Sequence, residues 1–153
     1  NYNILKIYRL LLVFILFFCT LSFSQVKMIS LNIENLGKSK SDESIAFMAS
    51  TLKDYDVIAL QEVVAGYGGA QAVAQHADEL NRKGSKWDYA VSDPTSSSAY
   101  KTERYAFLWK TSSVKIIGRP WLEQQYALQI DRDLIMPLLI IKELNLRWQT
   151  FMR

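Results

Sequence analysis

The chain has 153 residues, of which 50% are hydrophobic and 22% are charged. This is a globular composition, and the length suffices for one hydrophobic core. The net charge is +3, but Lys6 and Arg9 lie in an apolar N-terminal segment, and the rest of the chain holds 16 basic and 15 acidic residues. The charge balance therefore gives no indication of nucleic-acid binding. Because Cys19 is the single cysteine, an internal disulfide is excluded.

The N-terminal segment has the layout of a secretory signal peptide. Basic residues precede an apolar run over residues 10–23, and Ser22 and Ser24 supply small side chains at its end. The run is short for a permanent membrane-spanning helix. We therefore expect residues 1–24 to be cleaved, leaving a secreted or periplasmic protein without stable membrane association. Lipidation at Cys19 and an uncleaved anchor remain as alternatives.

A buried strand ending in an acidic residue is the most informative segment. Residues 57–60 are four consecutive apolar residues, which predicts a strand covered on both faces. Gln61 and Glu62 follow directly, and open α/β sheets place ligand sites beyond the carboxyl ends of their strands. Glu62 is therefore a candidate site residue. The alternative is that the chain simply leaves the core at this point.

A strand, a helix and this buried strand follow one another along the chain. Residues 26–33 predict the first strand, with Asn32 near its end, and Ser39 or Ser41 is expected to cap the helix. Because such a unit places its strands in parallel, Asn32 and Glu62 should lie at the same edge of the sheet. An amide oxygen beside a carboxylate suits Mg²⁺, although asparagine at a strand end also forms turns.

A second helix is expected over residues 70–83, with Gly84 ending it. His76, the single histidine, lies on this helix. We interpret it as a structural or surface residue, because the neighbouring sequence supplies no carboxylate to orient it.

Three further strands are predicted towards the C-terminus. Residues 87–91 form the first, residues 100–110 become the second, and residues 112–117 are expected to pair with it. Glu103 and Arg104 begin the second of these strands, and taken alone they are expected to form an exposed charge pair.

Four segments together resemble the motifs of one enzyme superfamily. They are SLNIENLG (30–37), VIALQEV (57–63), ERYAFLWK (103–110) and DRD (131–133). In order and approximate spacing they are similar to the endonuclease/exonuclease/phosphatase superfamily, and the third resembles its deoxyribonuclease I branch. The resemblance implies an α/β fold, the four-layered α/β sandwich, of which residues 25–133 would form a truncated N-terminal half.

The resemblance also implies phosphodiester hydrolysis with a divalent metal. Glu62 would hold Mg²⁺, or another cation such as Mn²⁺ or Ca²⁺, and Asn32 would help to bind the metal or the phosphate. Glu103 would orient a catalytic histidine, and Arg132 would bind the substrate phosphate. The expected partner is nucleic acid, DNA more than RNA. Lipid or inositol phosphates are alternative substrates, and a non-catalytic fragment or binding module is a further alternative.

The chain departs from this pattern after Asp133. The superfamily's histidine strand and its later motifs are missing from residues 134–153. Codons permitted by these residues, shifted by one base, read Asp-Arg-Glu-Pro-Tyr and later Ala-Asn-Phe-His-Ala, the kind of strand that carries the histidine. We therefore expect an out-of-frame tail over residues 134–153 and a chain that is inactive as written, because the proton-transfer group is missing. A divergent natural tail is the alternative.

Overall fold

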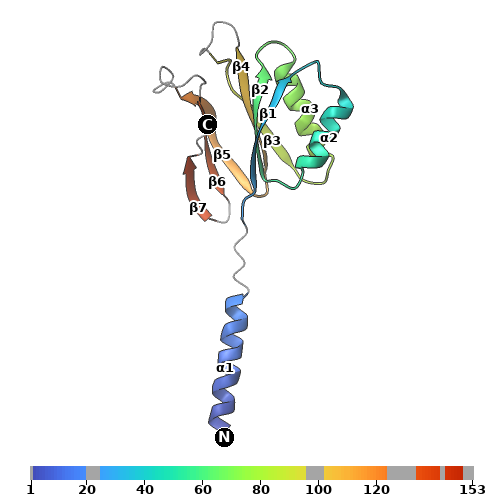
Figure 1. Ribbon diagram of the computed structural model, residues 1–153. Helices are drawn as coiled ribbons and strands as arrows, with labels where there is room; N and C mark the ends of the chain where they lie inside the picture. Colours follow the sequence, from blue (N-terminus) through green and yellow to red (C-terminus); the bar gives the residue numbers. More distant parts are fainter. Residues whose placement is uncertain (1, 20–24, 96–101, 124–133, 142–143, 150–153) are drawn as a thin grey trace.

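The computed structural model describes residues 2–19, 25–95, 102–123, 134–141 and 144–149 (Figure 1). Within these ranges, no helix is both long enough and apolar enough to cross a membrane. In chain order the elements are α1 (Tyr2–Cys19), β1 (Met28–Leu36), α2 (Asp42–Leu52), β2 (Val57–Val64), α3 (Gly69–Asn81), β3 (Trp87–Val91), β4 (Glu103–Lys110), β5 (Val114–Glu123), β6 (Leu134–Ile141) and β7 (Leu144–Gln149).

A mixed four-stranded sheet carries the candidate site. Its strand order is β1-β2-β4-β3, with β1 parallel to β2 and the other neighbours antiparallel. The parallel pairing of β1 and β2 confirms the arrangement predicted for the first strand, helix and strand of the chain. Both strands therefore end at the same edge of the sheet.

Helix α2 lies between β1 and β2 in the chain and helix α3 lies between β2 and β3, and both lie near the residues predicted to be helical. Ser41 caps α2, because its side-chain oxygen accepts a hydrogen bond from the backbone nitrogen of Ser44 at 3.2 Å. Helix α3 ends at Asn81, and Gly84 follows with a φ of +98°, which favours glycine. The helices then cover one face of the sheet, to the right of it in Figure 1.

Both faces of β2 are buried, as its apolar sequence predicted. Ile58 and Leu60 pack with the helices, whereas Val57 and Ala59 belong to a second cluster on the opposite face. Val114 at the start of β5 joins that second cluster, so the sheet is covered from both sides. The result is a mixed α/β fold of a helix layer and two sheets, which confirms the predicted fold class.

The predicted pairing of residues 112–117 with β4 is wrong. Strand β5 instead pairs with β6 in a separate sheet of order β5-β6-β7. The reason is that β4 already has β2 and β3 as neighbours and offers no free edge. Residues 134–141 and 144–149 form β6 and β7. The domain boundaries after residues 24 and 133 stay predictions.

Candidate functional site

The ends of β1 and β2 bring the two predicted side chains into contact. Asn32 lies opposite Gln61 in the parallel pairing. The Asn32 Nδ2 atom donates a hydrogen bond to Oε1 of Glu62 over 2.8 Å, and the Glu62 side chain is largely buried, with 6% exposed. A carboxylate at this depth needs polar partners, and Asn32 supplies one.

The backbone is strained at the same place. Glu34, Asn35 and Glu62 have φ values of 41°, 60° and 58°, and they are the only non-glycine residues with positive φ in the described part of the chain. Both strands also shift register there, after Asn32 in β1 and after Leu60 in β2. Such irregularities redirect side chains and are concentrated at functional sites. Strand β1 continues through this irregularity to Leu36, three residues beyond the predicted end of the first strand at residue 33.

The orientation of the Asn32 amide limits what it offers to Glu62. Its Oδ1 accepts a hydrogen bond from the backbone nitrogen of Glu34 at 2.9 Å, while its Nδ2 faces Glu62. Asn32 therefore meets Glu62 as a hydrogen-bond donor and fixes the position of the carboxylate. The role of Asn32 as a metal or phosphate ligand stays a prediction.

Glu103 provides a second buried carboxylate in the same hollow. Its Oε1 accepts a hydrogen bond from the Tyr105 hydroxyl at 3.1 Å, whereas its buried Oε2 has no hydrogen-bond partner among the described residues. A cavity of about 160 Å³ contacts both Glu62 and Glu103. Two carboxylates from neighbouring strands thus share one small cavity, and Glu103 retains an acceptor that no described residue uses. The other lining residues are Asn35, Val63, Val64, Ala65, Gly66 and Thr102.

The expected charge pair between Glu103 and Arg104 is wrong. Glu103 is buried, and Arg104 donates to two backbone oxygens, Ala65 O at 2.9 Å and Ser92 O at 2.8 Å. Arg104 therefore ties the loop after β2 to the end of β3. The guanidinium group suits this bridge because its donors point in fixed directions.

The remaining predicted residues fall elsewhere. Arg132 lies outside the described residues. His76 is fully buried on α3, and neither ring nitrogen has a hydrogen-bond partner in the described part of the molecule. Burial lowers the pKa of His76 to about 4. It is a structural residue, as interpreted from the sequence, and it does not line the cavity.

Sequence reasoning missed Asn35 and the bridging role of Arg104. Asn35 lines the cavity in a left-handed conformation, which asparagine adopts more readily than most residues. Its place before Leu36 and Gly37 was a signal for such a conformation. No pattern in the sequence indicated which carbonyl oxygens Arg104 reaches.

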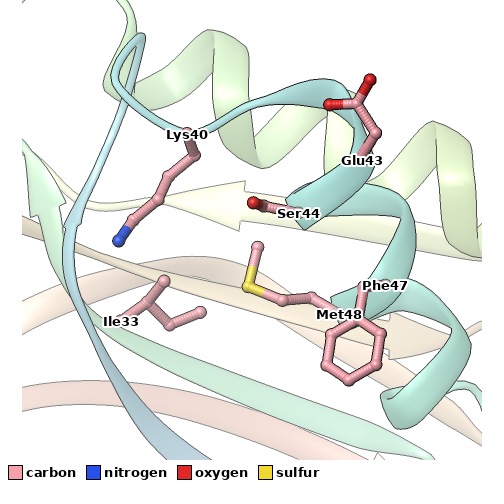
Figure 2. A pocket seen from close by; sticks show the side chains of 6 residues that line it. All are labelled: Ile33, Lys40, Glu43, Ser44, Phe47 and Met48. Carbon is pink, nitrogen blue, oxygen red and sulfur yellow. The ribbon is translucent and has the colours of Figure 1, made fainter.

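A larger hollow lies between β1 and α2, away from the paired carboxylates. Its volume is about 370 Å³. Figure 2 shows Met48 between Ile33 and Phe47, while the carboxylate of Glu43 points away. Since this hollow is mainly apolar and lacks converging acidic groups, we place the candidate site at Glu62. Lys40 and Ser44 complete its lining.

No group of three or more histidine, cysteine, aspartate or glutamate side chains is placed to hold a metal ion within the described ranges. A metal at this edge would therefore have at most two carboxylates of the described residues within the cavity, those of Glu62 and Glu103. Mg²⁺ tolerates such a site, because it keeps several water ligands and also binds substrate phosphate.

Comparisons with known proteins show which proteins the chain resembles in sequence and in fold. No protein-family model matches the chain. A deoxyribonuclease of Thioalkalivibrio sp. (strain K90mix) is 29% identical over 96 residues, which cover 62% of this chain and 25% of that protein. The crystal structure of ANGEL2, a 2′,3′-cyclic phosphatase, superposes with a TM-score of 0.50 at 18% identity, over 77% of this chain and 37% of ANGEL2. A humanised D. rerio TDP2 gives a TM-score of 0.49 at 17% identity, over 82% of this chain and 46% of TDP2.

The sequence match and the shared fold relate this chain to the endonuclease/exonuclease/phosphatase superfamily and its deoxyribonuclease I-like fold, as the four motifs predicted. The relation is to hydrolases of the nuclease and phosphodiesterase type. The chain spans about a quarter of the length of the deoxyribonuclease and less than half of each solved structure.

Proposed function

We propose that this chain carries the metal-binding half of a phosphodiesterase site that cleaves nucleic acid, with DNA as the preferred substrate. The observation that carries the proposal is the buried carboxylate of Glu62, held by Asn32 at the end of β2 and facing the same cavity as Glu103. The deoxyribonuclease relative supports DNA as the substrate class.

The side chains at this edge fit a hard divalent cation. Glu62 supplies one fixed carboxylate, and Mg²⁺ is typically held by one or two carboxylates together with water and substrate phosphate. When bound, the cation polarises a phosphoryl oxygen. Asn32 holds the carboxylate of Glu62 in one orientation. The Glu62 side chain therefore loses less conformational entropy when a cation binds.

Glu103 has the geometry of an orienting residue. Its Oε2 is buried and has no hydrogen-bond partner in the described part of the chain, so it can accept a proton donor such as a ring N–H of histidine. His76 does not fill this role, because it is buried in the core and does not line the cavity. We propose that the catalytic histidine is encoded in the original reading frame downstream of the Asp133 codon, and that residues 134–153 are the out-of-frame translation of that region.

The proposal extends to localisation and to the substrate phosphate. Residues 1–24 would direct the protein out of the cytoplasm, and Arg132 would contact the phosphate through its guanidinium group. Both follow from the sequence motifs.

Nicking of supercoiled plasmid DNA tests the proposal. We would compare this chain with a version whose reading frame is restored at the Asp133 codon, each with Mg²⁺ and with EDTA. The restored protein should nick the plasmid only with Mg²⁺, and Glu62→Gln should slow it about 10²-fold or more, because metal stabilisation of the reacting phosphate amounts to several kcal/mol.

Glu43→Gln is the matched control, because it removes the same charge from an exposed position in the first turn of α2. A folded, restored protein that fails to nick DNA would refute the proposal. Nicking that persists in EDTA or in the Glu62→Gln variant would refute the metal role of Glu62.

A further inference from the structure

An aromatic side chain and a lysine meet at the surface beside the cavity. Tyr67 lies in the loop between β2 and α3 and is 78% exposed. The Nζ atom of Lys38, from the loop after β1, lies 4.5 Å from the centre of the Tyr67 ring. The Tyr67 hydroxyl also accepts a hydrogen bond from Nε2 of Gln71 at 2.8 Å, which fixes the direction of the ring.

The two loops approach each other closely at Gly68 and Lys38, and Gly37 lies close to Val64 at the end of β2. Gly68 has a φ of +110°, and a Cβ atom added there would lie 2.8 Å from Cγ of Lys38. A Cβ atom on Gly37 would lie 2.8 Å from Cγ2 of Val64. A side chain at either position would crowd its neighbour, and the positive φ of Gly68 additionally favours glycine. The loop that presents the exposed Tyr67 ring is therefore closely packed against its neighbours.

The loop that carries Tyr67 is also anchored at its other end. Arg104 donates to the carbonyl oxygen of Ala65, two residues before Tyr67, at 2.9 Å. An aromatic ring presented on a fixed loop loses little conformational entropy when a ligand stacks on it. Tyr67 therefore differs from the isolated apolar residues that are common on protein surfaces and have no binding role.

The loop that carries Tyr67 borders the candidate site. Gly66, its neighbour in the chain, and Val64 both line the cavity that contains Glu62. The loops carrying Lys38 and Tyr67 follow the parallel strands β1 and β2, so both start at the edge of the sheet where Glu62 lies (Figure 1). A polynucleotide with one phosphate in the cavity would extend over this surface.

We propose that Tyr67 and Lys38 form a stacking subsite for a nucleobase that flanks the bound phosphate. The base would stack on the face of the Tyr67 ring opposite Lys38. The ammonium group of Lys38, which lies over the other face, would attract the backbone phosphate. This subsite rests on the proposed function, because the cavity is taken to hold a phosphodiester. It adds a base-dependent contribution to affinity that the metal site alone does not supply.

The test measures binding by fluorescence anisotropy in EDTA, which prevents cleavage. Two labelled probes of equal length are compared: a single-stranded oligodeoxynucleotide and an oligomer with the same phosphates and abasic sugars. The chain should bind the base-containing probe more tightly. Tyr67→Ala should weaken that binding by about 5- to 100-fold and leave the abasic probe unaffected, since stacking acts on bases alone.

Matched variants separate stacking from structural effects. Tyr67→Phe should retain the preference for bases, because the ring remains. Lys38→Ala should weaken binding of both probes and reduce its salt dependence. Tyr89→Ala, which removes a tyrosine from β3 that is 40% exposed, should change neither affinity. Circular dichroism checks that each variant is folded.

Equal affinity of the wild-type chain for both probes would overturn the subsite, and so would a base preference that survives Tyr67→Ala in a folded protein. The plasmid assay distinguishes this failure from failure of the proposed function. Nicking by the restored protein without base-dependent binding refutes the subsite alone. Base-dependent binding lost in Tyr67→Ala, without nicking, supports the subsite and refutes the nuclease.

Discussion

Asn32 donates a hydrogen bond to Glu62 across the parallel strands β1 and β2, with 2.8 Å between Nδ2 and Oε1. The contact joins residues that are 30 positions apart in the sequence. It forms where the backbone of Glu62 adopts a φ of 58°, so the carboxylate is positioned by a hydrogen bond and by a strained main chain together. Strain of this kind costs stability and persists where the surrounding structure imposes it.

Replacing Glu62 with glycine should give a more stable protein than replacing it with alanine. A left-handed conformation costs an L-residue roughly 1–2 kcal/mol, and glycine avoids this cost. Both variants lose the carboxylate and leave Asn32 without that partner, so these losses cancel in the comparison. Urea unfolding should show Glu62→Gly to be more stable than Glu62→Ala by about 1 kcal/mol.

The same pair of substitutions at Glu43 is the control and should show the opposite order. Glu43 lies in the first turn of α2, where alanine is favoured over glycine by about 0.5–1 kcal/mol. If alanine were the more stable substitution at both positions, the strain assigned to Glu62 would be wrong.

Two phenylalanines should differ sharply when each is replaced by alanine. Phe107 in β4 is fully buried between the two sheets, whereas Phe47 on α2 is 72% exposed. Phe107→Ala should lower the free energy of unfolding by about 3–5 kcal/mol, because it removes buried apolar surface and leaves a cavity. Phe47→Ala should change it by less than about 0.5 kcal/mol. Similar losses at both positions in urea unfolding would contradict the placement of the core.

The sequence allowed the elements nearest the site to be predicted well. The apolar run at residues 57–60 indicated a strand with two buried faces, and the unit of strand, helix and strand placed Asn32 beside Glu62. These inferences rest on local patterns and on the parallel geometry of such units, which constrain short segments strongly. The pairing of β5 depends instead on which edges of the sheet are free. No local pattern reveals that, and the predicted partner of β4 was wrong.

Side-chain partners in the candidate site were less predictable. The adjacent charges of Glu103 and Arg104 suggested an ion pair, but the alternation of a strand points neighbouring side chains to opposite faces. Glu103 therefore enters the cavity, and Arg104 reaches the carbonyl oxygens of Ala65 and Ser92. The pairing of Tyr67 with Lys38 likewise depends on the approach of two loops.

Ser41 should stabilise the protein through the N-terminus of α2. Its side-chain oxygen accepts a hydrogen bond from the backbone nitrogen of Ser44 at 3.2 Å. Ser41→Ala should therefore lower the free energy of unfolding by about 1 kcal/mol, as measured in urea. Ser50→Ala is the control, because Ser50 is exposed within the same helix and its hydroxyl donates a hydrogen bond to the carbonyl oxygen of Ala46. Alanine there should be neutral or slightly stabilising.

His76 should make the protein less stable as the solution becomes acidic. Burial lowers its pKa from 6.5 to about 4 in the folded protein. Between these values the unfolded chain binds more protons than the folded one, so stability falls as the pH drops from about 6.5 to about 4. Above pH 6.5 this loss disappears. Linkage gives a total effect of about 3 kcal/mol.

The His76→Leu variant isolates this effect from the titration of carboxylates. At pH 7 it should be as stable as the wild type or more so, because both ring nitrogens are buried without hydrogen-bond partners among the described residues. At pH 4.5 it should be clearly more stable. Urea unfolding from pH 4 to pH 8 gives the difference between the two proteins at each pH. A difference that stays constant across this range would show that His76 binds a proton equally in the folded and unfolded states, and its assignment as a buried neutral residue would then be wrong.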